Sequence, residues 1–323
     1  MIIKPRTMPL ILQKLKILER RLPAHHPAFS DIKRDAARWT AGYKGEKSID
    51  YPLTFLPAKD CFILHDIRLY DGTHFFQMDT IILSPVCLFI LEVKNMAGTL
   101  IFDPNFNQFI RKYEEKEEAF QHPLIQVNRH RSQLMNWLVS YGHAPLPIET
   151  LVVIGNTHSV LKKTNRNDTI HEKVVHSPLL PNKIFQLMDQ YKTNSVAKVQ
   201  LKTISDALKR SHMESNEDIL KRHHIKRLEV LSGVICPSCF SRPMERKHGR
   251  WKCSHCNHLS KTAHLEALDD YSLLFSSFIS NRQAQQFLHI SSEDVTKRLL
   301  KSLNTTHKGE NRGRKYLIPR YRR

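Results

Sequence analysis

Three consecutive apolar runs constrain the fold of this chain more than any other feature of its sequence. They read CFILHDIRLY, FFQMDTIILS and CLFILEVKN, and they lie between residues 61 and 95. Each run is rich in β-branched and aromatic residues, and two turn-forming pairs, Asp71-Gly72 and Ser84-Pro85, separate one run from the next. The runs therefore predict neighbouring strands of a largely buried sheet.

Helical patterns and further strands surround these runs. LILQKLKILERRL, near the start of the chain, carries leucine and isoleucine at helical spacing, and TLIFD with QFIRKYEEK predicts a hairpin. Pro123 stands where proline opens a helix, here PLIQVNRHRSQLMNWLVSY, and TLVVIGN follows as another buried strand. This order predicts an α/β fold in which helices flank a mixed sheet.

The length of 323 residues exceeds what one hydrophobic core usually organises. Changes in composition divide the chain into five expected parts: a basic helical segment at 1–39, the α/β domain at 40–190, a helical connector at 191–232, a cysteine module at 233–262 and a basic tail at 268–323. No apolar run approaches the roughly 20 residues that cross a membrane. We therefore expect a cytoplasmic protein without a membrane partner.

Positive side chains outnumber negative ones in the chain as a whole. Fifty lysines and arginines stand against 31 acidic residues, which gives a formal net charge of +19. Such an excess favours a polyanionic partner, and nucleic acid is the partner that we expect. The alternative is a basic protein whose charge serves solubility alone.

Polar and charged residues alternate with apolar ones in the second and third runs. Gln77 and Asp79 share one face of their predicted strand, and Glu92 and Lys94 share one face of the next. Burying Glu92 and Lys94 costs several kcal/mol unless they are paired or bind a metal. If the strands are neighbours, the four side chains converge, and carboxylates beside a lysine suit Mg²⁺-assisted hydrolysis of a phosphodiester. The alternative is an ordinary Glu–Lys ion pair at a strand end.

The spacing of these residues resembles that of a nuclease superfamily. Asp79, twelve further residues and then Glu92-Val93-Lys94 resemble the D…(D/E)-x-K signature of the restriction-endonuclease-like enzymes. Residues from about 40 to 160 more closely resemble the nuclease-related domain, NERD. The motifs that carry this resemblance are Gly45-Glu46, Gln77-Met78-Asp79 and FILEVKN followed by Gly98. Met78 replaces the proline of the superfamily signature, a change that the NERD pattern tolerates.

The resemblance implies a restriction-endonuclease-like fold and a divalent metal, Mg²⁺ or Mn²⁺, held by Asp79 and Glu92. It also implies that Lys94 is the catalytic lysine and that Glu46, on the preceding helix, is an accessory acid. Gln126 and His130 are four residues apart on the following helix and therefore share one face. We expect Gln126 to line the site and His130 to lie at the surface or to contact phosphate.

Four of the six cysteines form two C-x-x-C pairs, Cys236/Cys239 and Cys253/Cys256, with thirteen residues between the pairs. This spacing is typical of a tetrahedral Zn²⁺ site with four thiolate ligands. The site is structural, because zinc supplies folding energy that a module of about 30 residues cannot obtain from its core. The segment resembles the zinc ribbons of bacterial topoisomerases, which implies contact with nucleic acid. Trp251 is expected either to stack on a base or to fill the small core.

The basic tail contains two short helical segments, SNRQAQQFLHI and SSEDVTKRLLKSL, whose serines suit N-cap positions. Joined by a turn, they fit a helix-turn-helix, and the segment from Lys308 to Ile318 resembles the wing of winged-helix domains. The expected DNA contacts are Lys297, Arg298 and Lys301 on the second helix and Arg312, Arg314 and Lys315 on the wing. The alternative is a charged helical extension that binds DNA without specificity.

Together these features favour an Mg²⁺-dependent nuclease that cuts DNA and whose zinc and winged-helix modules present the substrate. A second hypothesis is a non-catalytic adaptor that binds nucleic acid and keeps the nuclease-like sheet as a scaffold, since a fold does not guarantee a reaction. A third is a DNA-binding regulator dominated by the tail. The complete set of Asp79, Glu92 and Lys94 favours the enzyme.

Overall fold

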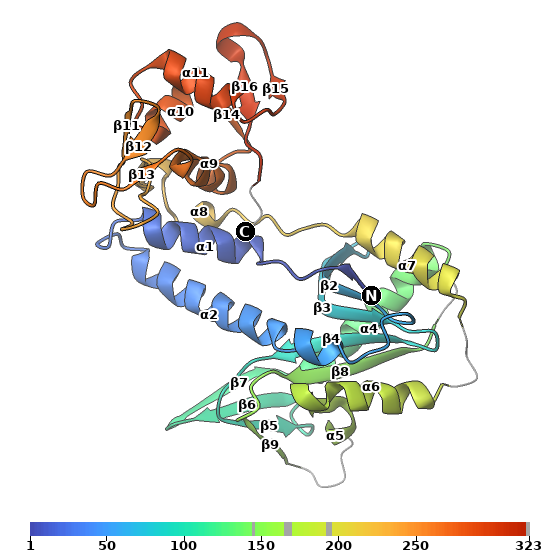
Figure 1. Ribbon diagram of the computed structural model, residues 1–323. Helices are drawn as coiled ribbons and strands as arrows, with labels where there is room; N and C mark the ends of the chain where they lie inside the picture. The colour runs from blue at the N-terminus through green and yellow to red at the C-terminus, as the bar shows by residue number, and fades with distance from the viewer. Residues whose placement is uncertain (144–145, 165–169, 192–195, 321–323) are drawn as a thin grey trace. The chain divides into compact units, whose positions relative to one another are not determined.

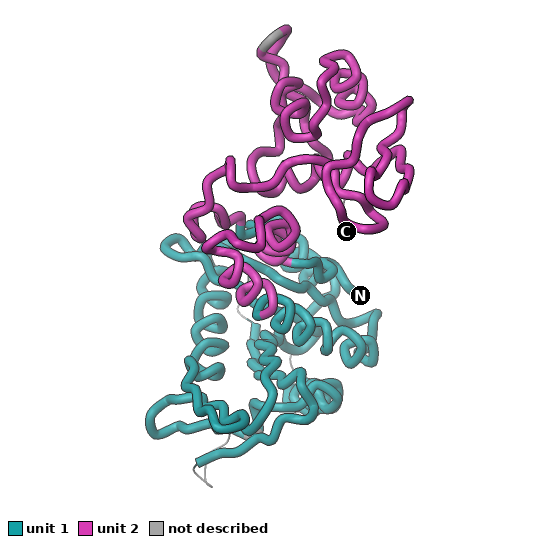
Figure 2. Tube along the Cα trace, turned by 90° about the vertical axis from the view of Figure 1, so that its left-hand side faces the viewer, with its two compact units in different colours: residues 1–8, 38–215 teal, residues 9–37, 216–323 magenta. Residues whose placement is uncertain are grey.

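The computed structural model describes residues 1–143, 146–164, 170–191 and 196–320. The chain divides into two compact units, which Figure 2 colours separately. Unit 1 consists of Met1–Met8 and Arg38–Ser215, and unit 2 consists of Pro9–Ala37 and Asn216–Arg323. The chain thus passes from unit 1 into unit 2 after its first eight residues and returns to unit 1 within one long helix.

A mixed six-stranded sheet forms the centre of unit 1 (Figure 1). Its strands, in spatial order, are β1 (Ile2–Lys4), β2 (Phe62–Tyr70), β3 (Phe75–Leu83), β4 (Leu88–Lys94), β8 (Ile148–Ile154) and β10 (Val174–His176). The three apolar runs form β2, β3 and β4, which pair antiparallel. In contrast, β1 runs parallel to β2, and β4, β8 and β10 run parallel to one another. The predicted mixed sheet is confirmed.

Helices cover both faces of this sheet. They are α4 (Pro123–Ser140) and α7 (Lys198–Ser211) on one face, and α3 (Asp50–Leu53) and α6 (Leu180–Asp189) on the other. Ile81 of β3 and Ile90 of β4 share a core with α4 and α7, whereas Ile82 and Phe89 share a second core with α3 and α6. Burial on both faces explains why these strands read as nearly continuous apolar runs.

A second sheet of four strands belongs to the same unit. Its spatial order is β7 (Lys116–Gln121), β6 (Gln108–Tyr113), β5 (Thr99–Asp103) and β9 (Val160–Lys163). The strands β5 and β6 form the predicted hairpin, and β7 extends it. Leu100, Phe102 and Phe109 of this sheet join the core beneath α4. The short α5 (Ile170–Lys173) and η1 (Ser177–Leu179) lie on either side of β10 in the chain.

The start of the chain contains a strand that the sequence pattern did not indicate. The helices predicted there are present as α1 (Leu10–Arg21) and α2 (Phe29–Lys47), but β1 precedes them. A strand of three residues at a sheet edge has too few positions for a recognisable alternation. It pairs with β2 and so brings the residues that follow it, including Arg6, to the central sheet.

Unit 2 combines helices with two small antiparallel sheets. It contains α8 (Ile219–Arg222), η2 (Arg227–Glu229), β11 (Glu245–Lys247), β12 (Arg250–Lys252), β13 (Leu259–Ser260), α9 (Ala263–Leu274), β14 (Phe278–Ser280), α10 (Asn281–Leu288), α11 (Glu293–Lys301), β15 (His307–Lys308), η3 (Asn311–Gly313) and β16 (Lys315–Leu317). One apolar core runs through the cysteine module and the tail. A fully buried ion pair between Arg21 of α1 and Asp270 of α9 (2.7 Å) ties α1 to this core.

Two helices of the tail begin where the sequence predicted. Ser280 caps α10 by accepting a hydrogen bond from the N–H of Gln283, and Ser292 caps α11 by accepting one from the N–H of Val295. These caps satisfy backbone donors that a helix start otherwise leaves unpaired. Among the described helices of both units, none is long and apolar enough to cross a membrane.

Candidate functional site

Strands β3 and β4 separate at the point where their charged residues stand. Their backbone pairing ends at Thr80↔Leu91, so Asp79 and Glu92 are the first opposed residues beyond it. There the N–H of Val93 donates a hydrogen bond to the Asp79 carboxylate (2.8 Å). Strand β4 continues beside β8 past this point. We call this place, where Asp79 and Glu92 face each other, the fork.

Lys94 joins the fork to helix α4. Its Nζ donates to Oε1 of Glu92 (2.7 Å) and to Oε1 of Gln126 on α4 (3.1 Å). The side chain of Glu92 is 4% exposed and that of Lys94 is 24% exposed, so the ammonium group is reachable from solvent whereas the carboxylate is nearly enclosed. The structure therefore brings Asp79, Glu92, Lys94 and Gln126 together.

The carboxyl groups of the fork have raised pKa values. Burial, and then the negative charge of Asp79, raises the pKa of Glu92 to about 7, and burial also raises the pKa of Asp79. Oε2 of Glu92 is buried and accepts no hydrogen bond from any described residue. A buried polar atom without a partner costs free energy. An oxygen in this state, within the negative potential of a second carboxylate, fits a bound cation.

The structure corrects the expected placement of His130. This side chain is only 5% exposed, and its Nδ1 lies 4.0 Å from Oε2 of Glu92. Burial, and then the positive charge of Arg129, lowers its pKa to about 4, so that the ring is neutral near pH 7. The ring lies beside Phe76 of β3. His130 therefore lines the buried side of the fork, and a surface position is wrong because α4 turns this residue towards the sheet.

Glu46 lies near the end of α2, beside the fork. A Cβ added to Gly45 would lie 2.1 Å from the Cβ of Asn95, so only glycine lets α2 approach the end of β4 this closely. The side-chain amide of Asn95 also donates to a backbone carbonyl of α2 (2.8 Å). Burial, and then the charge of Asp79, raises the pKa of Glu46 to about 8. The Gly45-Glu46 motif and Asn95 therefore share a packing role, because they hold the end of α2 close to the end of β4.

Arg6 is a site residue that no sequence motif indicated. Its side chain is 3% exposed and forms ion pairs with Glu46 (2.9 Å), Asp50 (3.3 Å) and Asp66 (3.4 Å). Arg6 precedes its nearest partner by forty positions, and no motif surrounds it. Its only sequence signal was that it belongs to a basic segment, which does not distinguish it from the other cations there.

Gln77, expected beside Asp79, is exposed on β3 and lies opposite Arg68 of β2.

Within the described part of the chain, only the four cysteines form a group of three or more potential metal ligands whose atoms all lie within 4.8 Å of one another. No three carboxylates around the fork meet this criterion among the described residues. Asp79 and Glu92 are thus the pair that could hold Mg²⁺, which commonly binds one or two protein carboxylates and completes its shell with water and phosphate oxygens.

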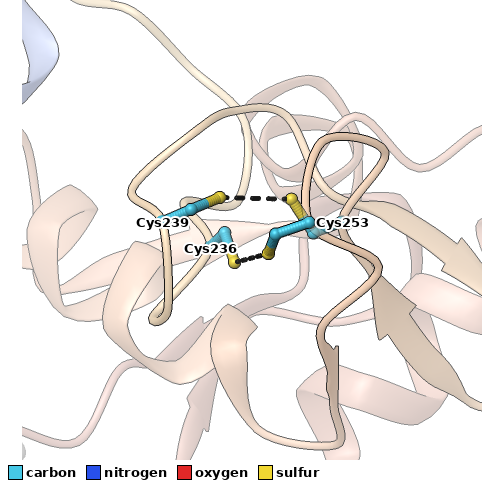
Figure 3. A group of neighbouring side chains, drawn as sticks. Cys236, Cys239 and Cys253 are labelled. Carbon is cyan, nitrogen blue, oxygen red and sulfur yellow. Dashed lines mark hydrogen bonds between the residues drawn. The ribbon is translucent and has the colours of Figure 1, made fainter.

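The four predicted zinc ligands converge in unit 2 (Figure 3). The Sγ atoms of Cys236 and Cys256 are 3.6 Å apart, as are those of Cys239 and Cys253. Four sulfurs at about 2.3 Å from a tetrahedral Zn²⁺ would lie about 3.8 Å from one another. The observed spacing therefore fits a structural zinc ion.

Each C-x-x-C pair forms the same kind of turn. The N–H of Phe240 donates to the carbonyl of Cys236, and the N–H of Asn257 donates to the carbonyl of Cys253, both at 3.0 Å. Phe240 and Asn257, one position after the second cysteine of each pair, have φ values of 59° and 58°. This left-handed conformation is uncommon outside glycine and asparagine. Two equivalent turns thus supply two thiol groups each.

Trp251 belongs to the core of unit 2. Its side chain is 0% exposed, and its Nε1 donates to Nδ1 of His264 (3.1 Å). Of the two roles considered from the sequence, filling the core is therefore correct, and stacking on a nucleic-acid base is excluded in this conformation.

The cations expected to contact DNA lie mostly at the surface of the tail. Lys297, Arg298 and Lys301 are exposed on α11, Lys315 is exposed on β16, and Arg314 is partly exposed. For Arg312 the structure describes only the backbone, in η3, so the expected role of its side chain lies outside the described part.

Comparison with known proteins agrees with the sequence motifs. Residues 41–155 match the model of the nuclease-related domain family, NERD. An uncharacterized protein of Bacillus anthracis is 25% identical to this chain over 201 residues, which cover 61% of this chain and 88% of the relative. No solved structure matches the chain. The chain therefore carries a nuclease-related domain whose matched span contains the fork, Lys94, Gln126 and Glu46.

Proposed function

We propose that this protein is a metal-dependent nuclease that hydrolyses phosphodiester bonds of DNA, with Mg²⁺ as its metal and Mn²⁺ as a substitute. The observation that carries this proposal is the fork itself. Asp79 and Glu92 face each other where two strands separate, and Lys94 lies 2.7 Å from Glu92, all within the segment that matches a nuclease-related family.

Each residue of the fork has a separate role in this proposal. Asp79 and Glu92 would hold Mg²⁺, which when bound polarises the phosphodiester and lowers the pKa of a bound water. The Lys94 ammonium has three N–H donors, and two of them go to Glu92 and Gln126. The third can orient the attacking water or donate to a phosphate oxygen as negative charge develops on it. Glu46 would serve as the accessory acid.

The order of elements in unit 1 supports a restriction-endonuclease-like core. A helix that carries Glu46 is followed by the antiparallel strands β2, β3 and β4, and then by α4 and the parallel strand β8. Asp79 and the Glu92-Lys94 pair lie on adjacent central strands of this arrangement. The short α3 is inserted between α2 and β2, and β5, β6 and β7 are inserted between β4 and α4.

The alternative function is a non-catalytic adaptor that binds nucleic acid. Two observations favour it: Lys94 is already paired with Glu92, and no three carboxylates of the described residues offer oxygens that all lie within 4.8 Å of one another. A scaffold that had lost its reaction would keep such an ion pair for stability. The two functions differ in whether divalent metal produces cleavage.

We expect purified protein to degrade end-labelled DNA when Mg²⁺ is present and to leave it intact in the presence of a chelator. Single- and double-stranded DNA and RNA, assayed side by side, define the substrate. Asp79→Ala should abolish cleavage because it removes one of two carboxylates at the fork. Binding of all four substrates without cleavage by the wild type would instead favour the adaptor.

The topology of the tail supports DNA binding by a winged helix. The order is α9, β14, α10, α11, β15 and β16, and the three strands form one antiparallel sheet in the order β14-β16-β15. A helix pair followed by a strand hairpin is the arrangement of a helix-turn-helix with a wing. The exposed cations of α11 would then face DNA, which supports the assignment of Lys297, Arg298 and Lys301.

Replacing these three residues of α11 with alanine should weaken DNA binding and reduce its salt dependence. Each phosphate contact that is lost should lower the slope of log affinity against log salt concentration by about 0.9. A matched control replaces three exposed lysines of unit 1, namely Lys59, Lys116 and Lys162, and so makes the same change in net charge. Equal effects of the two triple variants would show that α11 is not the contact surface.

A further inference from the structure

We propose that Arg6 is a positioning residue of the nuclease centre, which holds Glu46 and Asp66 against the strand that carries Asp79. The inference rests on the proposed function and extends the centre beyond the segment that matches the nuclease-related family, since Arg6 precedes residue 41. It assigns to the N-terminal segment a role in the site and not only in the sheet.

Arg6 links three elements around the fork. Its Nη1 donates to Oε2 of Glu46 on α2 (2.9 Å) and to Oδ1 of Asp66 on β2 (3.4 Å), and it also reaches the backbone carbonyl of Asp79 on β3 (3.5 Å). Its Nη2 donates to Oγ1 of Thr80 (3.0 Å). The guanidinium therefore contacts the backbone at the residue whose side chain forms one arm of the fork.

Asp66 of β2 lies opposite Asp79 of β3. The pairs His65↔Thr80 and Ile67↔Met78 place Asp66 directly across from Asp79 in the register of β2 and β3. Asp66 has a φ of 53°, which is a left-handed conformation that non-glycine residues adopt at an energetic cost. Such a conformation persists only where the surrounding structure enforces it, so the contacts around Asp66 determine where its carboxylate points.

Two residues of the N-terminal segment, Lys4 and Arg6, supply the contacts around Asp66. Lys4 Nζ donates to the backbone carbonyls of His65 (2.8 Å) and Asp66 (3.3 Å), which fixes the unusual backbone, and Arg6 binds the Asp66 carboxylate. The strand β1 between Met1 and Arg6 pairs with β2 and delivers both cations to this place. The backbone and the side chain of Asp66 are therefore held by one short segment.

The arginine offers what a lysine could not. Its planar guanidinium has five N–H donors in a fixed arrangement, and here it spans Glu46, Asp50 and Asp66 at the same time. A lysine would keep the charge that these carboxylates need but could not reach all of them from one point. Charge and position can therefore be separated by substitution, which distinguishes a positioning role from a purely stabilising one.

The test compares Arg6→Lys with the wild type in the zinc-loaded chain of 323 residues. We expect Arg6→Lys to fold because the charge is kept, and to melt below the wild type because a lysine cannot reach all three carboxylates. Both proteins are therefore compared at a temperature at which each is fully folded. The affinity of Arg6→Lys for Mn²⁺, measured by calorimetry, and its single-turnover rate of DNA cleavage should each fall by about 10- to 100-fold, as is usual when a group behind a metal ligand is lost, here one that reaches the backbone of Asp79. Arg6→Met removes the charge as well and should lower both quantities further or prevent folding.

Lys173→Met is the matched control. It removes a cation from the buried carboxylate of Glu149 in the same unit, at the opposite end of β8 from the fork, and should leave Mn²⁺ affinity unchanged. Wild-type levels of Mn²⁺ affinity and cleavage in Arg6→Lys would overturn the inference while leaving the proposed nuclease intact. A wild type that neither binds Mn²⁺ nor cleaves would instead reject the proposed function, and the inference with it.

Discussion

Lys94→Ala should cleave DNA about 100- to 1,000-fold more slowly than the wild type, the usual consequence of removing one group that stabilises charge in a transition state. The affinity for DNA should barely change, because ground-state binding is shared among many cations distant from the fork. The measurements are the single-turnover rate at saturating DNA, the dissociation constant and the melting temperature, all on one preparation. Loss of cleavage with unchanged melting identifies Lys94 as a catalytic residue.

A purely structural Lys94 predicts a different result. Removing it would leave the nearly enclosed carboxylate of Glu92 unpaired, which typically costs about 3–5 kcal/mol. The pKa of Glu92 is already raised to about 7, above the value of an unfolded chain, so its contribution to stability is lost as the pH rises through that value. The drop in melting temperature would then be larger above neutral pH than below it, and the folded fraction would still cleave.

Lys112→Ala provides the comparison for Lys94→Ala. Lys112 pairs with Glu117 at the same distance of 2.7 Å. The side chains of both residues are about half exposed and belong to the second sheet of unit 1. Exposed pairs of this kind contribute little to stability. Lys112→Ala should therefore leave the cleavage rate and the melting temperature unchanged. A loss of cleavage equal to that of Lys94→Ala would instead show that the assay responds to the removal of any lysine of unit 1.

Structure could be predicted best from the sequence where one physical requirement applies to consecutive residues. Strands buried on both faces must be apolar along their length, so β2, β3 and β4 could be recognised directly. The zinc site is also local in sequence, because each C-x-x-C pair forms its own turn. Asp79 and Glu92 could be paired because β3 and β4 are consecutive antiparallel strands, which places their charged positions opposite one another.

The sequence was least informative where a side chain acts through a distant contact. Arg6 contacts Glu46 and Asp66 only when β1 is paired with β2. No sequence pattern near Arg6 indicates that pairing. His130 was misplaced because a polar residue on a helix is usually exposed. Its burial depends on β3 lying across α4, which is a property of the assembled domain and not of the helix.

Removal of zinc should unfold the cysteine module, and this is the largest effect expected in unit 2. Binding of structural zinc contributes about 10–16 kcal/mol in small peptides near pH 7, more than a small module gains from its own core. We expect about one zinc ion per chain by elemental analysis, as four ligands imply. Cys253→Ser should retain little of it. Hydrogen exchange followed by mass spectrometry should show lost protection across 233–262, including the strand pair β11 and β12.

The effect should extend beyond the module, because its residues share one core with the tail. Cys236, Cys253 and Trp251 lie in the same apolar cluster as Leu288 of α10 and Leu300 of α11. Loss of zinc should therefore also reduce protection in these helices and weaken DNA binding, whereas Cys61→Ala, which removes a buried thiol from unit 1, should retain zinc and DNA affinity. Full protection of α10 and α11 in Cys253→Ser would mean that the tail folds without the zinc module, and its DNA binding would then have to be assigned to the tail alone.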